Sequence, residues 1–175
     1  MRFTPTSIHG VVIADWDAAV DERGAFARLH CPEDFAAGGH PFAPAQTSLS
    51  RNDRAGTLRG MHYQAAPRAE AKLVRVTRGR IFDVAIDLRP RSPTFRQWTG
   101  TELSAANGRA LLIGEGMAHG FVTLEDDTDV LYQISRAFEP GYGLGVRWDD
   151  PAFAIQWPVK PTVMSERDAS YPDFA

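Results

Sequence analysis

The fold is decided by residues 72–88, which read KLVRVTRGRIFDVAIDL. In residues 80–88, apolar side chains occupy every second position, and the positions between them include the carboxylates Asp83 and Asp87. Alternation with a period of two is typical of a β-strand that has one buried face. Residues 72–77 alternate in the same way, and Arg78-Gly79 joins the two runs, so we predict that they form a β-hairpin.

Further short strand-like runs follow, separated by turn-forming sequences. They lie at residues 94–103, 109–113, 118–124, 129–135 and 144–148. The 15 glycines and 12 prolines are spread evenly along the chain, and helix is expected only at residues 32–37 and 165–169. The pattern predicts an all-β protein, a sandwich or a small barrel, in a single domain over residues 1–175.

Composition excludes several classes of function. The chain has 175 residues, is 43% hydrophobic and carries a formal net charge of -3, which describes one soluble domain without the clustered positive charge that nucleic acid requires. Residues 1–10 lack an apolar run behind a basic flank, and no stretch is long and apolar enough for a membrane helix. Because Cys31 is the only cysteine, we expect a reduced, cytoplasmic protein with neither a disulfide nor a zinc site.

The densest polar cluster on strand-like sequence is residues 58–64 with residues 71–73 after it. Side chains two apart on a strand share a face, so His62 and Gln64 point together, and we expect Lys72 to face them across the sheet. Each of these residues alone is more often an ordinary core or surface residue. Together with Arg59 they indicate a site. Only two of the 19 basic residues are lysines, Lys72 and Lys160, which raises the question of why position 72 requires an ammonium group.

Three other clusters are weaker. His119 and Phe121 share a face in residues 116–121, and Tyr132 alternates with aliphatic residues on an inward face, where a structural and a functional role are about equally plausible. Residues 164–168, which include Asp168, are on pattern alone an ordinary solvated helical turn.

Metal and nucleophilic chemistry are disfavoured. Gln64 stands where a metal-binding β-barrel would need its second histidine, and the Lys72 ammonium would repel a cation, so we expect no metal. Cys31 has no nucleophile motif around it. A histidine base, a tyrosine acid and a cation that stabilises an oxyanion remain, which are the parts needed to move protons at a carbon beside a carbonyl group.

At these residues the chain resembles the dTDP-4-dehydrorhamnose 3,5-epimerase family of cupin-type jelly-roll enzymes. The matching segments are residues 21–26, 58–64, 72–76, 81–89, 91–95, 115–121, 131–132, 148–151, 155–158 and 165–168. The resemblance implies proton exchange at C3 and C5 of a nucleotide-linked 4-keto-6-deoxyhexose, with no cofactor.

The resemblance also implies a role for each site residue. His62 becomes the general base, oriented by Asp168, and Tyr132 the acid that protonates the opposite face of the sugar. Lys72 becomes the group that stabilises the enolate.

Substrate-binding positions follow from the same resemblance. Arg59 and Arg23 would hold the substrate, chiefly its diphosphate, and the family positions extend the predicted substrate-binding set to Arg28, Gln46, Ser48, His119 and Arg167. The family is commonly dimeric with an exchanged N-terminal strand, for which residues 8–13 are the candidate, so we expect a homodimer.

Four positions depart from the family pattern. Arg28 replaces a glutamate and Ser48 an asparagine, while Gly143 replaces a carboxylate and Phe138 a tyrosine. Since arginine has only donors, Arg28 cannot accept a hydrogen bond from thymine N3–H. We expect dTDP as the nucleotide and inversion at both carbons. A GDP- or CDP-linked sugar, a mono-epimerase or keto-isomerase, and a sugar-binding module without turnover remain as alternatives.

Overall fold

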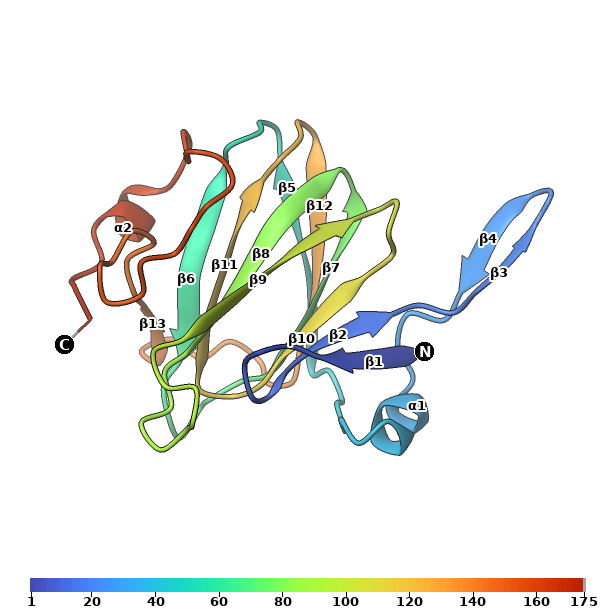
Figure 1. Cartoon of the computed structure of the whole chain (residues 1–175), viewed down its shortest axis with the longest axis horizontal. Coiled ribbons are helices and arrows are strands. Elements are labelled where there is room, and N and C mark those ends of the chain that lie inside the picture. Colours follow the sequence, from blue (N-terminus) through green and yellow to red (C-terminus); the bar gives the residue numbers. More distant parts are fainter. Residues whose placement is uncertain (175) are drawn as a thin grey trace.

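Two antiparallel sheets packed face to face form the body of the protein in a computed structural model that describes residues 1–174 (Figure 1). The six-stranded sheet has the order β1 (Arg2–Pro5), β2 (Val11–Asp15), β10 (Ala110–Ile113), β7 (Lys72–Arg78), β12 (Thr128–Ile134) and β5 (Gln46–Asn52). The five-stranded sheet has the order β13 (Gly143–Gly145), β6 (Leu58–Gln64), β11 (Met117–Thr123), β8 (Arg80–Asp87) and β9 (Trp98–Ser104). The predicted all-β class is confirmed.

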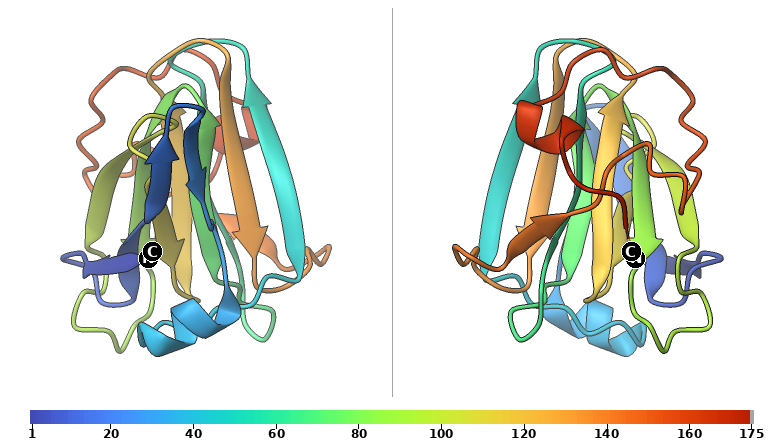
Figure 2. Two further views of the ribbon diagram at one scale, coloured as in Figure 1. Left: turned by 90° about the vertical axis from the view of Figure 1, so that its right-hand side faces the viewer. Right: turned by 90° about the vertical axis from the view of Figure 1, so that its left-hand side faces the viewer.

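The core lies between the two sheets, where Val74 of β7 packs in one cluster with Ile81 of β8 and Phe121 of β11. Both sheets are also covered on their outer faces. Helix α1 (Pro32–Ala37) covers part of the six-stranded sheet through Phe35, and the C-terminal segment covers the five-stranded sheet, as the right-hand view of Figure 2 shows. This double cover explains why β8 is buried on both faces although its sequence alternates.

The predicted hairpin of residues 72–77 and 80–88 is wrong, because β7 and β8 lie in different sheets. Gly79 has a φ of +78° and carries the chain from one sheet to the other; a Cβ there would lie 2.3 Å from Thr128 Oγ1. Alternation reports one apolar side for each strand, and this need not be the side that faces the other sheet: Val84 and Ile86 of β8 pack under the C-terminal segment, whereas Ile81 and Ala85 face the core. Two strands with one apolar side each occur equally well as neighbours or on opposite sides of a sandwich. Lys72 therefore faces His62 across the sandwich and not across one sheet.

Most other predicted elements agree with the structure. The runs at 109–113, 118–124 and 129–135 are strands β10, β11 and β12, each displaced by one residue at most. The run at 94–103 forms a strand only from Trp98, and the run at 144–148 is a strand only over Gly143–Gly145. The helix predicted at 32–37 is α1, and that at 165–169 is α2 (Glu166–Ala169), with Ser165 as its N-cap.

A hairpin of β3 (Ala18–Asp21) and β4 (Gly24–Ala27) projects from the body at the right of Figure 1. The side chains of Val20 and Phe26 on it are 76% and 81% exposed. In this single chain, the candidate exchange strand at residues 8–13 overlaps β2, which pairs with β1 and β10. None of the helices described within residues 1–174 is long and apolar enough to cross a membrane.

Candidate active site

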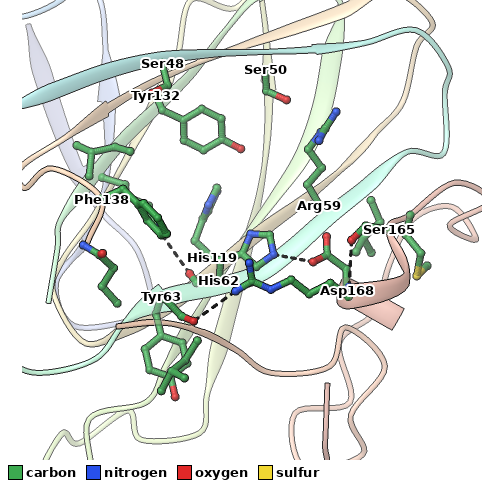
Figure 3. A pocket seen from close by; sticks show the side chains of 18 of the residues that line it. Ser48, Ser50, Arg59, His62, Tyr63, His119, Tyr132, Phe138, Ser165 and Asp168 are labelled. Atoms are coloured by element: carbon green, nitrogen blue, oxygen red, sulfur yellow. Dashed lines mark hydrogen bonds and ion pairs between the residues drawn. The ribbon is translucent and has the colours of Figure 1, made fainter. Parts of the chain in front are cut away.

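A cavity of about 690 Å³ lies between β6 of one sheet and β5 and β12 of the other, and β13 and α2 border it (Figure 3). It is lined by most of the predicted site residues, which come from distant parts of the sequence. Those in its lining are Ser48, Arg59, His62, Lys72, His119, Tyr132, Arg167 and Asp168. Strands β6 and β11, which carry His62 and His119, lie close together because each has a glycine at the contact. A Cβ on Gly60 would lie 2.5 Å from the Cα of Gly120.

His62 and Asp168 form a hydrogen-bonded pair at one wall. His62 Nε2 lies 2.7 Å from Asp168 Oδ1, and the other carboxylate oxygen accepts a hydrogen bond of 3.2 Å from the Gly60 N–H. Burial alone would raise the pKa of Asp168, but its hydrogen bonds to His62 and Gly60 outweigh burial and hold that pKa below its ordinary value. The carboxylate is therefore ionised at neutral pH and fixes the orientation of the imidazole, whose Nδ1 is left free of it.

Tyr132 occupies the opposing sheet. Its ring packs edge-on against His119, with ring centroids 5.8 Å apart, and Figure 3 shows the phenol and His62 extending into the cavity from different sides. Burial raises the pKa of the Tyr132 hydroxyl far above its ordinary value, and the nearby Asp83 carboxylate raises it further. The phenol therefore keeps its proton at neutral pH and is equipped to donate it.

Lys72 is a buried side chain in the lining of the same cavity, close to the backbone of His62. Its Nζ donates to the backbone oxygen of His62 at 3.1 Å and pairs with Glu70 Oε1 at 3.1 Å. Nearby, His119 Nε2 lies 2.6 Å from Asp83 Oδ1, and both of these side chains are buried. Burial lowers the pKa of Lys72, while Glu70 and Asp83 oppose that effect.

Two arginines of the cavity lining have guanidinium groups without a carboxylate partner among the described residues. Arg59 donates to Asn52 Oδ1 at 2.7 Å, and Arg167 donates to the Gly143 backbone oxygen at 3.3 Å. Guanidinium groups whose charge is not neutralised are suited to bind a phosphate.

The predicted nucleotide contacts divide into two groups. Ser48 lines the cavity, whereas Gln46 stands behind it: Gln46 donates to the Ser48 hydroxyl at 3.0 Å and accepts from the Phe138 N–H at 3.0 Å. Gln46 thus holds two rim residues in place. Phe138 and Gly143 also line the cavity, so three of the four positions that depart from the family pattern, with Ser48, border the space a substrate would fill.

The structure of one chain does not bring Arg23 and Arg28 to the cavity. Arg23 lies in the turn of the β3–β4 hairpin and pairs with Asp21, and Arg28 pairs with Asp34 at 3.4 Å. The hairpin projects away from the body, so residues 21–28 do not contact the pocket of their own chain.

Two residues of the site region escaped the sequence analysis. Glu70 lines the cavity and pairs with Lys72, and the ring of Tyr171 packs edge-on against His62 with centroids 6.1 Å apart. Glu70 could have been predicted, because it is an acidic residue two positions before the only lysine on strand-like sequence. Nothing in the sequence pattern indicates Tyr171. Within residues 1–174, no three His, Cys, Asp or Glu side chains converge in a way that would hold a metal ion.

Comparison with known proteins matches the chain from end to end. The profile of the family described as dTDP-4-dehydrorhamnose 3,5-epimerase matches residues 5–175. The chain is 41% identical over 173 residues to dTDP-4-dehydrorhamnose 3,5-epimerase of Methanothermobacter thermautotrophicus, covering 97% of this chain and 92% of that protein.

Solved structures agree with the sequence matches. The crystal structure of dTDP-4-dehydrorhamnose 3,5-epimerase from Bacillus anthracis with TDP and PPi bound superimposes with a TM-score of 0.96 at 36% identity, over 99% of both chains. A Legionella pneumophila dTDP-6-deoxy-D-glucose-3,5-epimerase in complex with dTDP-4-keto-L-rhamnose superimposes with a TM-score of 0.90 at 36% identity, over 96% of this chain and 89% of that one. The predicted cupin-type jelly roll is thereby confirmed.

Proposed function

The chain belongs to the dTDP-4-dehydrorhamnose 3,5-epimerase family and is an epimerase, and we propose that it inverts C3 and C5 of a dTDP-linked 4-keto-6-deoxyhexose. One observation carries the assignment of the chemistry to residues: a histidine paired with an ionised carboxylate and a protonated tyrosine extend from opposing sheets into one cavity. Inversion requires a base on one face of the sugar and an acid on the other.

His62 is the base in this proposal. Its Nε2 is engaged with Asp168, so Nδ1 takes the proton from the carbon beside the keto group. The imidazolium that forms is stabilised by the Asp168 carboxylate at 2.7 Å. Because Asp168 is buried, little water competes for this interaction.

Lys72 stabilises the enolate that this proton transfer produces. A compact ammonium group directed at the C4 oxygen interacts more strongly as negative charge develops on that oxygen. The interaction is therefore stronger in the transition state than in the bound substrate, and it lowers the activation barrier. Tyr132 then donates its proton to the opposite face of the same carbon and completes the inversion. Repetition at the second carbon of the ring gives the doubly inverted sugar.

Arg59 and Arg167 bind the diphosphate, and Ser48 and His119 complete the contacts to the substrate, while Gln46 acts from behind the cavity by holding Ser48 and Phe138 in place. The crystal structures of the relatives contain TDP or a dTDP-linked sugar, which supports dTDP as the nucleotide here. Competition binding with dTDP, GDP and CDP tests this assignment. A preference for GDP or CDP would contradict it.

We further propose a cytoplasmic homodimer in which the β3–β4 hairpin of one chain reaches the cavity of the other. Exposed Phe26 supports this arrangement, as does the position of Arg23 and Arg28 away from their own cavity. Light scattering at micromolar concentration should give twice the mass of the chain. A monomer with full activity would refute the proposal.

Deuterium incorporation tests the reaction directly. With dTDP-4-keto-6-deoxyglucose in D₂O, the enzyme should place label at C3 and C5, and His62→Ala should place none. Tyr132→Phe should still exchange the proton removed by His62 but form little inverted product. Label at one carbon only would establish a mono-epimerase, and full inversion by Tyr132→Phe would show that another group is the acid.

A further inference from the structure

Glu70 makes a buried contact with the lysine of the site. It lies in the connection between β6 and β7, and its side chain is 9% exposed, as is that of Lys72. Glu70 Oε1 lies 3.1 Å from Lys72 Nζ. Two buried, oppositely charged side chains in contact interact strongly, and removing one of them leaves the other charge uncompensated.

We propose that Glu70 is a positioning residue for epimerisation, which holds the Lys72 ammonium in its charged form and at a fixed place on the cavity floor. The inference deepens the proposed function, since it rests on Lys72 as the group that stabilises the enolate. Glu70 itself need not touch the substrate. Its role is exerted through the lysine.

The orientation of the Glu70 carboxylate is itself fixed. Its second oxygen, Oε2, accepts a hydrogen bond of 2.8 Å from Gln64 Nε2. Gln64 is buried, and its own oxygen accepts from the Glu139 N–H at 2.9 Å while its nitrogen also donates to the Arg68 backbone oxygen at 3.2 Å. The glutamate is thus held by a buried amide whose hydrogen-bonding groups are all engaged, so the carboxylate has one orientation to offer Lys72.

Among the charged groups around Lys72, Glu70 is the one placed to stabilise its ammonium form. Besides Glu70, Asp83 of β8 acts on Lys72 through its charge, and Arg59 and His62 of β6, His119 of β11 and Tyr132 of β12 line the same cavity. Asp83 is the other carboxylate among them, and its Oδ1 is already occupied by His119 at 2.6 Å. Among the described residues, Glu70 is the one acid within ion-pair distance of Nζ.

Burial lowers the pKa of Lys72, and Glu70 is the strongest of the influences that oppose it. Without the Glu70 charge, burial acts with less opposition, and the ammonium loses its proton at a lower pH. An uncharged amine would stabilise the enolate poorly. The fraction of active enzyme would then fall with rising pH, although the fold and the nucleotide site were unchanged.

The lysine content of the chain permits a direct test. Lys72 and Lys160 are its two lysines, so lysine labelled with ¹³C at Cε gives two side-chain signals, and Lys160→Arg identifies that of Lys72. In the Lys160→Arg background, Glu70→Gln should lower the Lys72 midpoint by about one pH unit or more, the range expected for loss of an opposite charge in contact. Glu139→Gln is the matched control, because that rim carboxylate pairs with Arg68, and it should leave the midpoint unchanged.

Kinetics supply the second readout. The alkaline limb of the kcat profile should move to lower pH in Glu70→Gln by the same amount, with dTDP affinity unchanged, and Glu70→Asp should restore part of the shift. An unchanged Lys72 midpoint in a folded Glu70→Gln protein would overturn the inference, as would an equal loss of kcat at every pH. If Lys72→Met turns over normally while Glu70→Gln still shifts the midpoint, the proposed role of Lys72 in the reaction fails and the Glu70–Lys72 coupling stands.

Discussion

Replacement of Asp168 by asparagine should disable the base while preserving the shape of the site. Asp168 accepts from the Gly60 N–H through Oδ2 and contacts His62 Nε2 through Oδ1. An asparagine has one acceptor oxygen and an NH₂ group that only donates. Because the Gly60 N–H needs the oxygen, the NH₂ group must face Nε2, and His62 must then carry its proton on Nδ1, where the base should be free.

The magnitude follows from the lost interaction. A hydrogen bond to a charged group contributes about 1.5–3 kcal/mol, and 1.36 kcal/mol corresponds to a factor of ten in rate, so loss of the charge alone lowers kcat by about tenfold to more than a hundredfold. The misplaced proton adds to this loss. We expect kcat to fall by at least about a hundredfold, with KM little changed because the diphosphate contacts remain.

Initial rates of deuterium incorporation in D₂O measure the effect. Glu166→Gln on the same helix is the matched control, because Glu166 is exposed and does not line the cavity, so it should retain the rate of the unaltered enzyme. The reasoning is refuted if Asp168→Asn stays within tenfold of that rate, or if its KM rises while kcat holds.

Three other substitutions have defined outcomes. Lys72→Ala should lower kcat far more than dTDP affinity measured by calorimetry, and the reverse result would make Lys72 a binding residue. Asp87→Asn should cost about 3 kcal/mol in urea unfolding at pH 7, because its carboxylate accepts hydrogen bonds from Arg89 and two hydroxyl groups. Burial alone would raise the pKa of Asp87, but these hydrogen bonds hold it below its ordinary value of 3.8. The stability that they contribute is therefore present above about pH 4 and is lost as the pH falls through the folded-state pKa. The difference in unfolding free energy between Asp87→Asn and the unaltered protein should shrink in acid. Gly120→Ala should destabilise the fold by about 1–3 kcal/mol, since the added Cβ would lie 2.6 Å from Met61 Sδ, and an unchanged unfolding midpoint would contradict this contact.

Sequence periodicity predicted the strands but not their arrangement. Alternation placed β10, β11 and β12 to within one residue, because each has a core-facing side. Alternation could not show whether β7 and β8 are neighbours in one sheet or lie in opposite sheets, because both arrangements give each strand one apolar side. Pairing between strands depends on contacts between residues far apart in the sequence, and a local hydrophobic pattern does not contain information on those contacts.

The site was predictable to a similar extent. His62 and Lys72 stood out because they belong to the densest polar cluster on strand-like sequence, and the structure brings them together. Asp168, separated by 106 positions from His62, has nothing in its local sequence to distinguish it from a surface helix residue, and only the resemblance to a family assigned it. Arg23 is the converse case, since its proposed role depends on a second chain.

The two walls of the cavity differ in a way that makes proton transfer directional. His62 is 40% exposed and rests on an ionised carboxylate, so it can take a proton and return it to water. Tyr132 is half-buried against the core, and burial raises the pKa of its hydroxyl, so it holds its proton until a strongly basic carbon, the enolate, lies against it. Once Tyr132 has donated, the buried phenolate is costly and must be reprotonated before the next inversion. Two inversions on one bound sugar therefore require that a proton return to Tyr132 between them.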